Sequence, residues 1–159
     1  MNVTPLSVEY INEVHDLMEL GEPCIRARGL SDYWLYAELF SSTCPIMIDK
    51  NNTPTGAVIA FRSQDNPAEV YIQDVMIHPD HRQQGIARTL LNSVHTQAEK
   101  WGCERIYLTS EPENKAAHAT WTNLGYVNVP GDHEIDGVSV TTDYKGPGRS
   151  RAVYEFSVG

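Results

Sequence analysis

The stretch from Tyr71 to Leu91 constrains the fold of this chain more than any other part of its sequence. It opens with three strand-forming side chains, Ile72, Val75 and Ile77. A Pro-Asp pair at positions 79 and 80 then ends the strand, because proline has no N–H to donate and aspartate favours turns. Beyond Gly85, apolar side chains recur every four residues, which is the period of a helix with one buried face. The stretch therefore predicts a strand, a turn and a helix.

The predicted turn has the properties of an anion-binding site. The N–H groups of a first helical turn lack partners and carry the positive end of the helix dipole. Gly85 has no side chain that would keep an anion from the backbone, and Arg82 and Arg88 add positive charge on either side. The turn lacks the Gly-Lys-Ser/Thr of mononucleotide loops and the three glycines of dinucleotide loops. It therefore predicts a different kind of phosphate or pyrophosphate site.

The rest of the chain predicts a single mixed α/β domain over residues 1–159, a length that can bury a sizeable core. We expect helices over about 8–20, 32–40 (with Ser31 as N-cap), 85–101 and 115–124. We expect strands over about 3–7, 44–48, 57–62, 71–77, 105–109, 127–129, 138–142 and 152–158. An early helical part, a hairpin and then alternating strands and helices indicate a central mixed β-sheet of six to seven strands with helices on both faces.

Composition narrows the classes of function. The net charge of −9 argues against a nucleic-acid partner, which would need a basic face. No apolar run is long enough to span a membrane, and the first residues do not resemble a signal peptide. Three scattered cysteines indicate reduced thiols, and so a cytoplasmic protein. His78 and His81 lack a third ligand nearby, so no metal site is predicted.

The pattern Arg82-x-x-Gly85-x-Ala87, after Asp74-Val-Met-Ile-His-Pro, resembles the acyl-CoA loop of the GNAT superfamily of N-acetyltransferases. The likeness covers roughly residues 70–129, and the first half of the chain matches only in the order of its elements. It implies a GNAT-like fold in which two parallel strands splay apart around the pantetheine arm of acetyl-CoA, the co-substrate. It further implies that the backbone of Val75, Met76 and Ile77 pairs with pantetheine. The pyrophosphate would be held by Arg82, Gln83, Gln84, Gly85, Ile86 and Ala87, with Arg88 near the phosphates. Asn114 and Trp121 are the remaining cofactor-binding residues that it implies.

One residue departs from the family pattern. Trp121 occupies the position where the family commonly has a tyrosine that protonates the departing thiolate. An indole N–H does not ionise usefully near neutral pH. The sequence leaves open whether another group or solvent supplies the proton, or whether the thiolate leaves unassisted.

The resemblance also suggests which carboxylate accepts the proton of the attacking amine. Asp74 is the leading candidate, because the family often has a carboxylate on this strand near the thioester. Glu111, after the next strand, is the second candidate. The alternative for Asp74 is a structural aspartate whose side chain points away from the site.

The expected reaction is transfer of an acetyl group to the primary amine of a small molecule, such as an amino acid, an amino-acid-like metabolite or an antibiotic. Tyr33, Trp34 and Tyr36 are expected to line the acceptor site. An acidic set would attract the amine, and a basic set in 130–151 would bind a carboxylate. The acidic set is Glu9, Glu13, Asp16, Asp132, Glu134, Asp136 and Asp143. The basic set is Lys145, Arg149 and Arg151. The alternatives are a protein N-terminal acetyltransferase and a non-catalytic acyl-CoA sensor, and a homodimer is also open.

Overall fold

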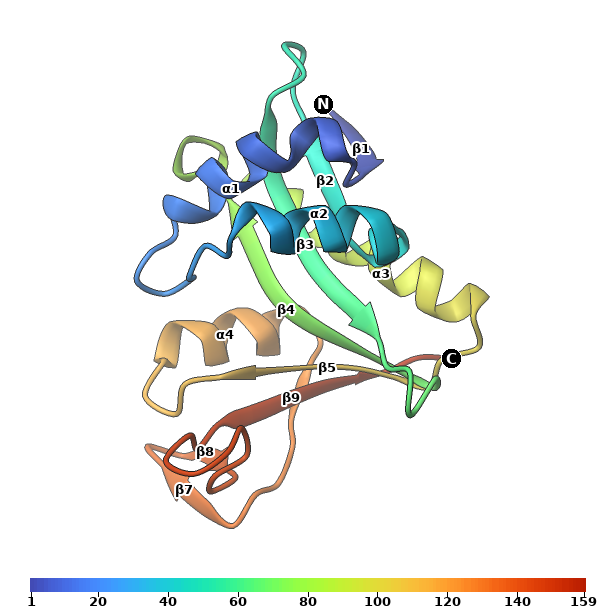
Figure 1. Cartoon of the computed structure of the whole chain (residues 1–159). Helices are drawn as coiled ribbons and strands as arrows, with labels where there is room; N and C mark the ends of the chain where they lie inside the picture. The colour runs from blue at the N-terminus through green and yellow to red at the C-terminus, as the bar shows by residue number, and fades with distance from the viewer.

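A seven-stranded sheet with the order β1-β2-β3-β4-β5-β9-β6 forms the centre of the protein (Figure 1). The structure is a computed structural model and describes all residues, Met1–Gly159. Only β4 and β5 are parallel, and every other neighbouring pair is antiparallel. The strands are β1 (Asn2–Pro5), β2 (Pro45–Ile48), β3 (Pro54–Arg62), β4 (Glu69–Ile77), β5 (Arg105–Ser110), β6 (Val127–Asn128) and β9 (Ala152–Ser157). A separate two-stranded sheet pairs β7 (His133–Ile135) with β8 (Val138–Val140).

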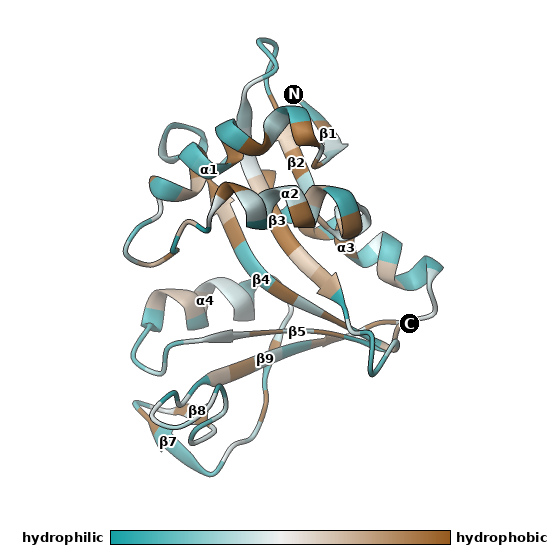
Figure 2. Cartoon of the chain, viewed as in Figure 1, coloured by the Kyte–Doolittle hydropathy of each residue, from teal (hydrophilic) through white to brown (hydrophobic).

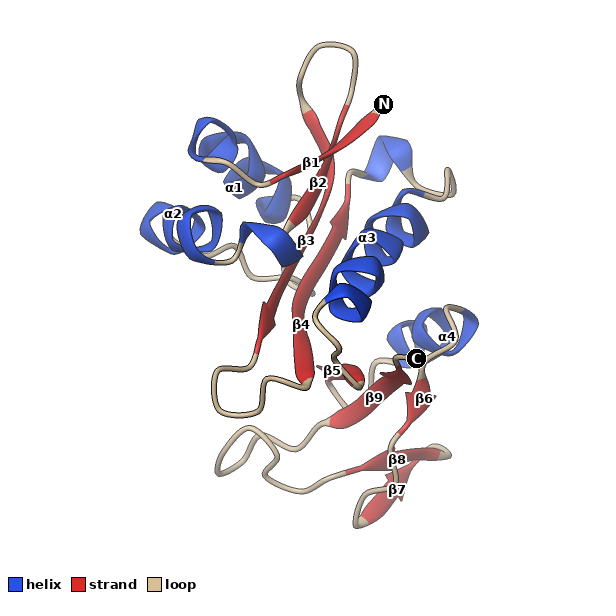
Figure 3. Cartoon of the chain, turned by 90° about the vertical axis from the view of Figure 1, so that its right-hand side faces the viewer, coloured by secondary structure: helices blue, strands red, loops and turns tan.

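Helices cover both faces of the sheet, as predicted (Figure 3). Helices α1 (Ile11–Glu19) and α2 (Leu30–Leu39) pack on one face, and α3 (Ile86–Lys100) and α4 (Lys115–Asn123) pack on the other. Each face therefore has its own hydrophobic core, and strongly hydrophobic residues lie along the central strands (Figure 2). None of the helices combines the length and the apolar character that crossing a membrane requires.

The pairing between β4 and β5 is short, and this opens the sheet. Residues 69–71 of β4 pair with residues 105–107 of β5, and both strands then continue without pairing to each other. Figure 1 shows the two strands diverging toward the end where α4 lies. A fork therefore separates the carboxyl ends of the two parallel strands.

Strand β4 also contains a bulge at Gln73. Ile59 of β3 pairs with Asp74, and the residue after Ile59 pairs with Ile72, so Gln73 is an extra residue in the ladder. Ile72 belongs to the core under α3, whereas Ile59 belongs to the core under α1 and α2. Asp74 therefore faces α1 and α2, and so does Gln73, whose amide donates to a tyrosine hydroxyl of α2 at 3.1 Å. The bulge turns two consecutive polar side chains to one face.

The expected helices and strands are all present, with two corrections. The N-cap of α2 is Gly29 and not Ser31, because the carboxylate of Asp32 accepts the N–H of Gly29 at 3.0 Å. Strand β7 was not predicted, because it has only three residues and they become a strand only by pairing with β8. The helix that begins after Gly85 has its apolar side chains buried at the predicted spacing.

Candidate active site

A cavity of about 620 Å³ lies at the fork between β4 and β5. Both strands contribute to its wall, together with the segment between α1 and α2, the start of α4 and the loop before β9. Its lining residues include Arg26, Arg28, Tyr71, Gln73, Asp74, Val75, Ser110, Glu111, Asn114, Trp121, Lys145, Arg149 and Arg151. The two residues predicted to be catalytic, Asp74 and Glu111, therefore line the same cavity.

Asp74 is the most buried charged group of this wall. It is only 8% exposed, and its Oδ2 has no hydrogen-bond partner. Burial raises the pKa of its carboxyl, while the Arg28 charge, the Gln73 amide and the Lys145 charge act in the opposite direction. A carboxylate whose pKa is raised toward neutrality is a better proton acceptor than an exposed one. The side chain thus has both the position and the chemistry of a general base.

The segment between α1 and α2 brings Arg26 and Arg28 to the cavity. The N–H of Arg28 donates to the hydroxyl of Tyr33 at 3.1 Å, and Tyr33 is fully buried in the core. This contact anchors the backbone of the segment to α2. The Nε of Arg28 is buried and has no partner in the protein.

The loop before β9 brings three more cations to the cavity. Its turn is closed by the N–H of Lys145 donating to the carbonyl of Arg149 at 3.0 Å, and by the N–H of Gly148 donating to the carboxylate of Asp143 at 2.9 Å. Lys145 then reaches β4, where its Nζ donates to the hydroxyl of Tyr71 at 2.6 Å. Hydrogen bonds therefore hold both the backbone of the turn and the side chain of Lys145 in place at the cavity.

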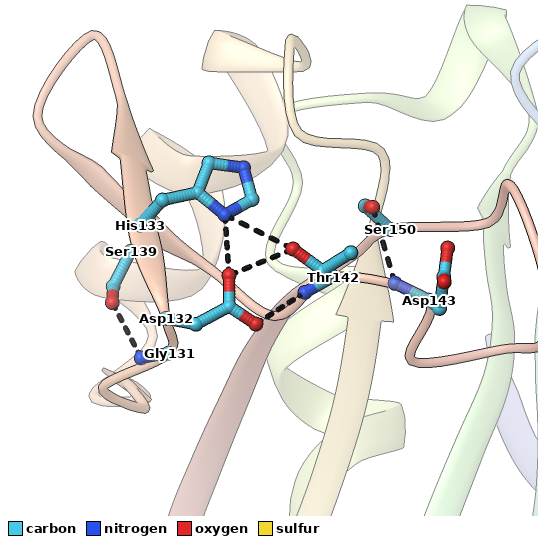
Figure 4. Close-up of polar contacts among 7 residues, drawn as sticks. All are labelled: Gly131, Asp132, His133, Ser139, Thr142, Asp143 and Ser150. Carbon is cyan, nitrogen blue, oxygen red and sulfur yellow. Dashed lines mark hydrogen bonds and ion pairs between the residues drawn. The ribbon is translucent and has the colours of Figure 1, made fainter.

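Two acidic residues of the same segment, Asp132 and Asp143, form contacts within it (Figure 4), whereas Asp136 pairs with Lys115 of α4. The carboxylate of Asp132 accepts the N–H and hydroxyl of Thr142 at 2.9 and 2.8 Å and pairs with His133. The hydrogen bonds from His133 and Thr142 hold the pKa of Asp132 at about 2. The cavity wall does not include any of the expected acidic set, namely Glu9, Glu13, Asp16, Asp132, Glu134, Asp136 and Asp143.

A second hollow of about 320 Å³ lies at the amino end of α3. Most of the predicted phosphate loop lines it, together with the last residue of β4, Ile77: Arg82, Gln83, Gly85, Ile86, Ala87 and Arg88. Gly85 has a φ of 77°, and a Cβ placed there would meet no atom within 4 Å. The loop thus leaves open space over the free N–H groups of the helix, with two arginines beside it. These features fit the pyrophosphate of an acyl-CoA.

Asn114 and Trp121 come from α4 and line the larger cavity, on the side of Val75. The Oδ1 of Asn114 caps α4 by accepting the N–H of Ala117 at 3.0 Å, so its amide N–H groups remain available to a ligand. The ring of Trp121 packs edge-on against Tyr126, with 5.1 Å between the ring centroids. Trp121 thus has a packing role as well as a place in the wall.

Other residues predicted from the sequence lie elsewhere. The side chain of Met76 is buried in the core under α1 and α2, so only its backbone is left for the predicted pairing with pantetheine. Gln84 lines neither hollow. Of the three aromatic residues expected at the acceptor site, Tyr33 is buried, Trp34 is 49% exposed and Tyr36 bonds Gln73, and none lines the cavity. Sequence reasoning missed Arg26 and Arg28, whose only signal was that they are the first basic residues of the chain.

Known proteins agree with this architecture. Among curated proteins, none is similar enough in sequence to count as a relative. The structure resembles diaminobutyrate acetyltransferase EctA from Paenibacillus lautus, solved with L-2,4-diaminobutyric acid and coenzyme A (TM-score 0.78, 19% identity, 99% of this chain and 94% of that one). It also resembles Naa20 from Chaetomium thermophilum, solved with a bisubstrate analogue (TM-score 0.76, 19% identity, 99% of this chain and 87% of that one). A third similar structure is the ribosomal-protein-S18-alanine N-acetyltransferase from Escherichia coli (TM-score 0.72, 14% identity, 99% of this chain and 94% of that one).

At these identities the structural likeness establishes the fold alone. The sequence profile of the acetyltransferase (GNAT) family matches residues 11–126, which include the phosphate loop, the fork and most of the cavity wall. With the splayed parallel strands and the open helix N-terminus, this match shows that the chain belongs to the acetyltransferase (GNAT) family.

Proposed function

We propose that the protein transfers the acetyl group of acetyl-CoA to the primary amine of a small, amino-acid-like acceptor, with Asp74 as the proton acceptor. The observation that carries this proposal is the buried carboxylate of Asp74, which has an unpartnered oxygen at the fork of the two parallel strands. The donor side is supported by the hollow at the start of α3, and by similar structures solved with coenzyme A or a bisubstrate analogue.

The reaction requires a neutral amine, because an ammonium group has no lone pair. The amine nitrogen forms a bond with the thioester carbonyl carbon, and collapse of the tetrahedral intermediate breaks the C–S bond. The attacking nitrogen loses one proton, and Asp74 receives it directly or through a water molecule. Glu111 is the second candidate, but it is exposed at the rim of the cavity, so its carboxylate is less suited to the task.

The departing thiolate takes up one proton to give CoA-SH. Trp121 lines the cavity but has no ionisable group near neutral pH. A thiol has a pKa not far above neutrality, about 8.5 for cysteine, so its thiolate is a fair leaving group without an acid. In this proposal solvent supplies that proton.

The acceptor side favours a molecule that carries a carboxylate besides its amine. Arg26 and Arg28 come from one segment and Lys145, Arg149 and Arg151 from another, and all five line the cavity. Arginine binds carboxylates with two parallel hydrogen bonds. EctA, which has a similar fold, was solved with an amino acid that also bears an amine side chain.

Two other functions remain candidates on specific observations. The Naa20 and S18-alanine enzymes have similar folds, so a protein N-terminus is a second acceptor class. The replacement of the expected tyrosine by Trp121 favours a non-catalytic acyl-CoA sensor. One assay of acetyl transfer distinguishes these two functions from the proposed reaction.

The test is release of free thiol from acetyl-CoA with single amino acids, their amides, a polyamine and short peptides as acceptors. The proposal predicts turnover with amino acids that falls at least about a hundredfold in Asp74→Asn. The exposed Asp65→Asn serves as the matched control and keeps parental turnover. Turnover only with peptides would favour the N-terminal acetyltransferase, and acetyl-CoA binding without any turnover would favour the sensor.

A further inference from the structure

The cavity holds an unusual share of the positive charge of this protein. The chain has 12 lysines and arginines against 21 aspartates and glutamates, and five of those 12 cations line this single cavity. Only two carboxylates, Asp74 and Glu111, share the wall with them. The cavity is therefore cationic within an acidic protein.

None of the five cations forms an ion pair within the protein. The only lysine and arginine side chains in ion pairs are Arg105 and Lys115, both outside the cavity. Arg28 has a buried Nε without a partner, and the one hydrogen bond of Lys145 Nζ goes to a neutral hydroxyl. Arg28 and Arg151 are half-buried, whereas Arg26, Lys145 and Arg149 are exposed. A half-buried charge without an ion-pair partner is costly, so the retention of Arg28 and Arg151 indicates that a ligand supplies the opposite charge. The three exposed cations add to the positive potential of the cavity.

The cations form two groups on separate segments, and Asp74 lines the same cavity as both groups. Arg28 belongs to the α1–α2 segment and Lys145 to the loop before β9, and both charges lower the pKa of Asp74. The phosphates of the donor have their own cations, Arg82 and Arg88, in the other hollow. The two cavity groups therefore remain for the acceptor.

We infer that the acceptor is an acidic amino acid, in which two acid groups flank the amine that Asp74 deprotonates. This inference rests on the proposed function and specifies its substrate class. Once the amine is neutral, a monocarboxylate neutralises one of the five cations and a dicarboxylate neutralises two. One acid group contacts Arg26 and Arg28, and the other contacts Lys145, Arg149 and Arg151. The same five cations repel polyamines and other cationic acceptors.

The experiment compares kcat/KM for acceptors that differ by one acid group. L-Glutamate has both groups, L-glutamine lacks the side-chain acid, isoglutamine lacks the α-carboxylate, and putrescine lacks both. L-Aspartate and O-phospho-L-serine distinguish a short carboxylate from a phosphate as the second group. We expect an acceptor with two acid groups to exceed glutamine and isoglutamine by about tenfold or more each, the effect of losing one charged hydrogen bond, and to exceed putrescine further.

Three variants assign the groups, with the Tm of each checked against the parent. Arg28→Gln should collapse the preference over one of the two amides, and the double variant Lys145→Gln, Arg149→Gln should collapse the preference over the other. Lys115→Gln, whose exposed cation pairs with Asp136 away from the cavity, should change neither preference.

The outcomes separate this inference from the proposed function. Glutamine or putrescine acting as well as the dicarboxylates would overturn the inference and leave the acetyltransferase proposal intact. Variants that raise KM for acetyl-CoA and leave acceptor preference unchanged would assign the cations to the donor, which also overturns it. A protein that binds acetyl-CoA and acetylates no amine would contradict the proposed function itself.

Discussion

Gln73 and Asp74 are consecutive in β4, yet their side chains lie on the same face of the sheet. Side chains normally alternate along a strand, so this arrangement exists only because Gln73 is an extra residue in the pairing with β3. The bulge adjoins the point where β4 parts from β5. Asp74 consequently enters the cavity from a strand whose three following residues, Val75, Met76 and Ile77, are all apolar.

The burial of Asp74 predicts a gain in stability when its charge is removed. Its folded pKa is raised above the unfolded value of about 3.9. The group therefore favours the folded state fully only below the unfolded pKa, and this contribution is lost as the pH rises through the folded pKa. Asp74→Asn should raise Tm relative to the parent at pH 7, and the difference should shrink toward pH 4. A Tm difference that is constant with pH would show that the carboxyl titrates normally.

The phosphate loop offers a matched pair of glycines. Gly85 and Gly102 precede and follow α3 with φ angles of 77° and 72°, and neither has an atom within 4 Å of an added Cβ. Glutamate at either position should cost about 1–2 kcal/mol of backbone strain and lower Tm to a similar extent. Only Gly85→Glu should lose the rise in Tm with acetyl-CoA, because it places a carboxylate at the helix N-terminus. Loss of the rise in both variants would contradict a specific phosphate site.

The sequence predicted the strand, turn and helix of the donor side well, because these elements depend on local structure. The strand, the turn with Gly85 and the four-residue apolar period of α3 are all properties of neighbouring residues, and they were confirmed. The acceptor side depends on contacts between distant segments. The bulge at Gln73 is defined only by pairing with β3, and Arg28 reaches the cavity because its backbone is held by Tyr33.

The aromatic residues of α2 illustrate the same limit. Spacing indicates which residues share a helix face, but not whether that face meets a core or a cavity. Tyr33 went to the core, and Tyr36 supports Gln73 from behind the wall. Neither side chain lines the cavity, so the structure does not support their predicted role as acceptor contacts. Instead, they hold Arg28 and Gln73, which do line it.

Replacement of Trp121 tests the assignment of the proton donor. Since an indole N–H does not ionise near neutral pH, Trp121→Phe should leave kcat close to the parental value, and Trp121→Tyr should equal or exceed it. Both rings preserve part of the edge-on packing against Tyr126, so Tm should fall only modestly. A large loss of kcat in Trp121→Phe without a loss of Tm would give the indole a direct part in the reaction.

Arg28 should tune the base electrostatically. Its charge lowers the pKa of Asp74, so Arg28→Gln should move the acidic limb of the pH–kcat/KM profile to higher pH. Arg149 lines the same cavity but does not shift the pKa of Asp74, so Arg149→Gln should leave the position of the limb unchanged. Equal shifts in the two variants would mean that the limb reports total cavity charge and not the Arg28–Asp74 interaction.

The pH dependence of kcat in the parent and in Asp74→Asn tests the role of Asp74 most directly. If Asp74 accepts the proton, the parent should show an acidic limb with an apparent pKa above the ordinary aspartate value of about 3.9. In Asp74→Asn this limb should disappear, and kcat at pH 7 should fall by about a hundredfold or more, while the rise in Tm with acetyl-CoA is retained. An Asp74→Asn variant with the parental limb and near-parental kcat would contradict the account and move the base to Glu111.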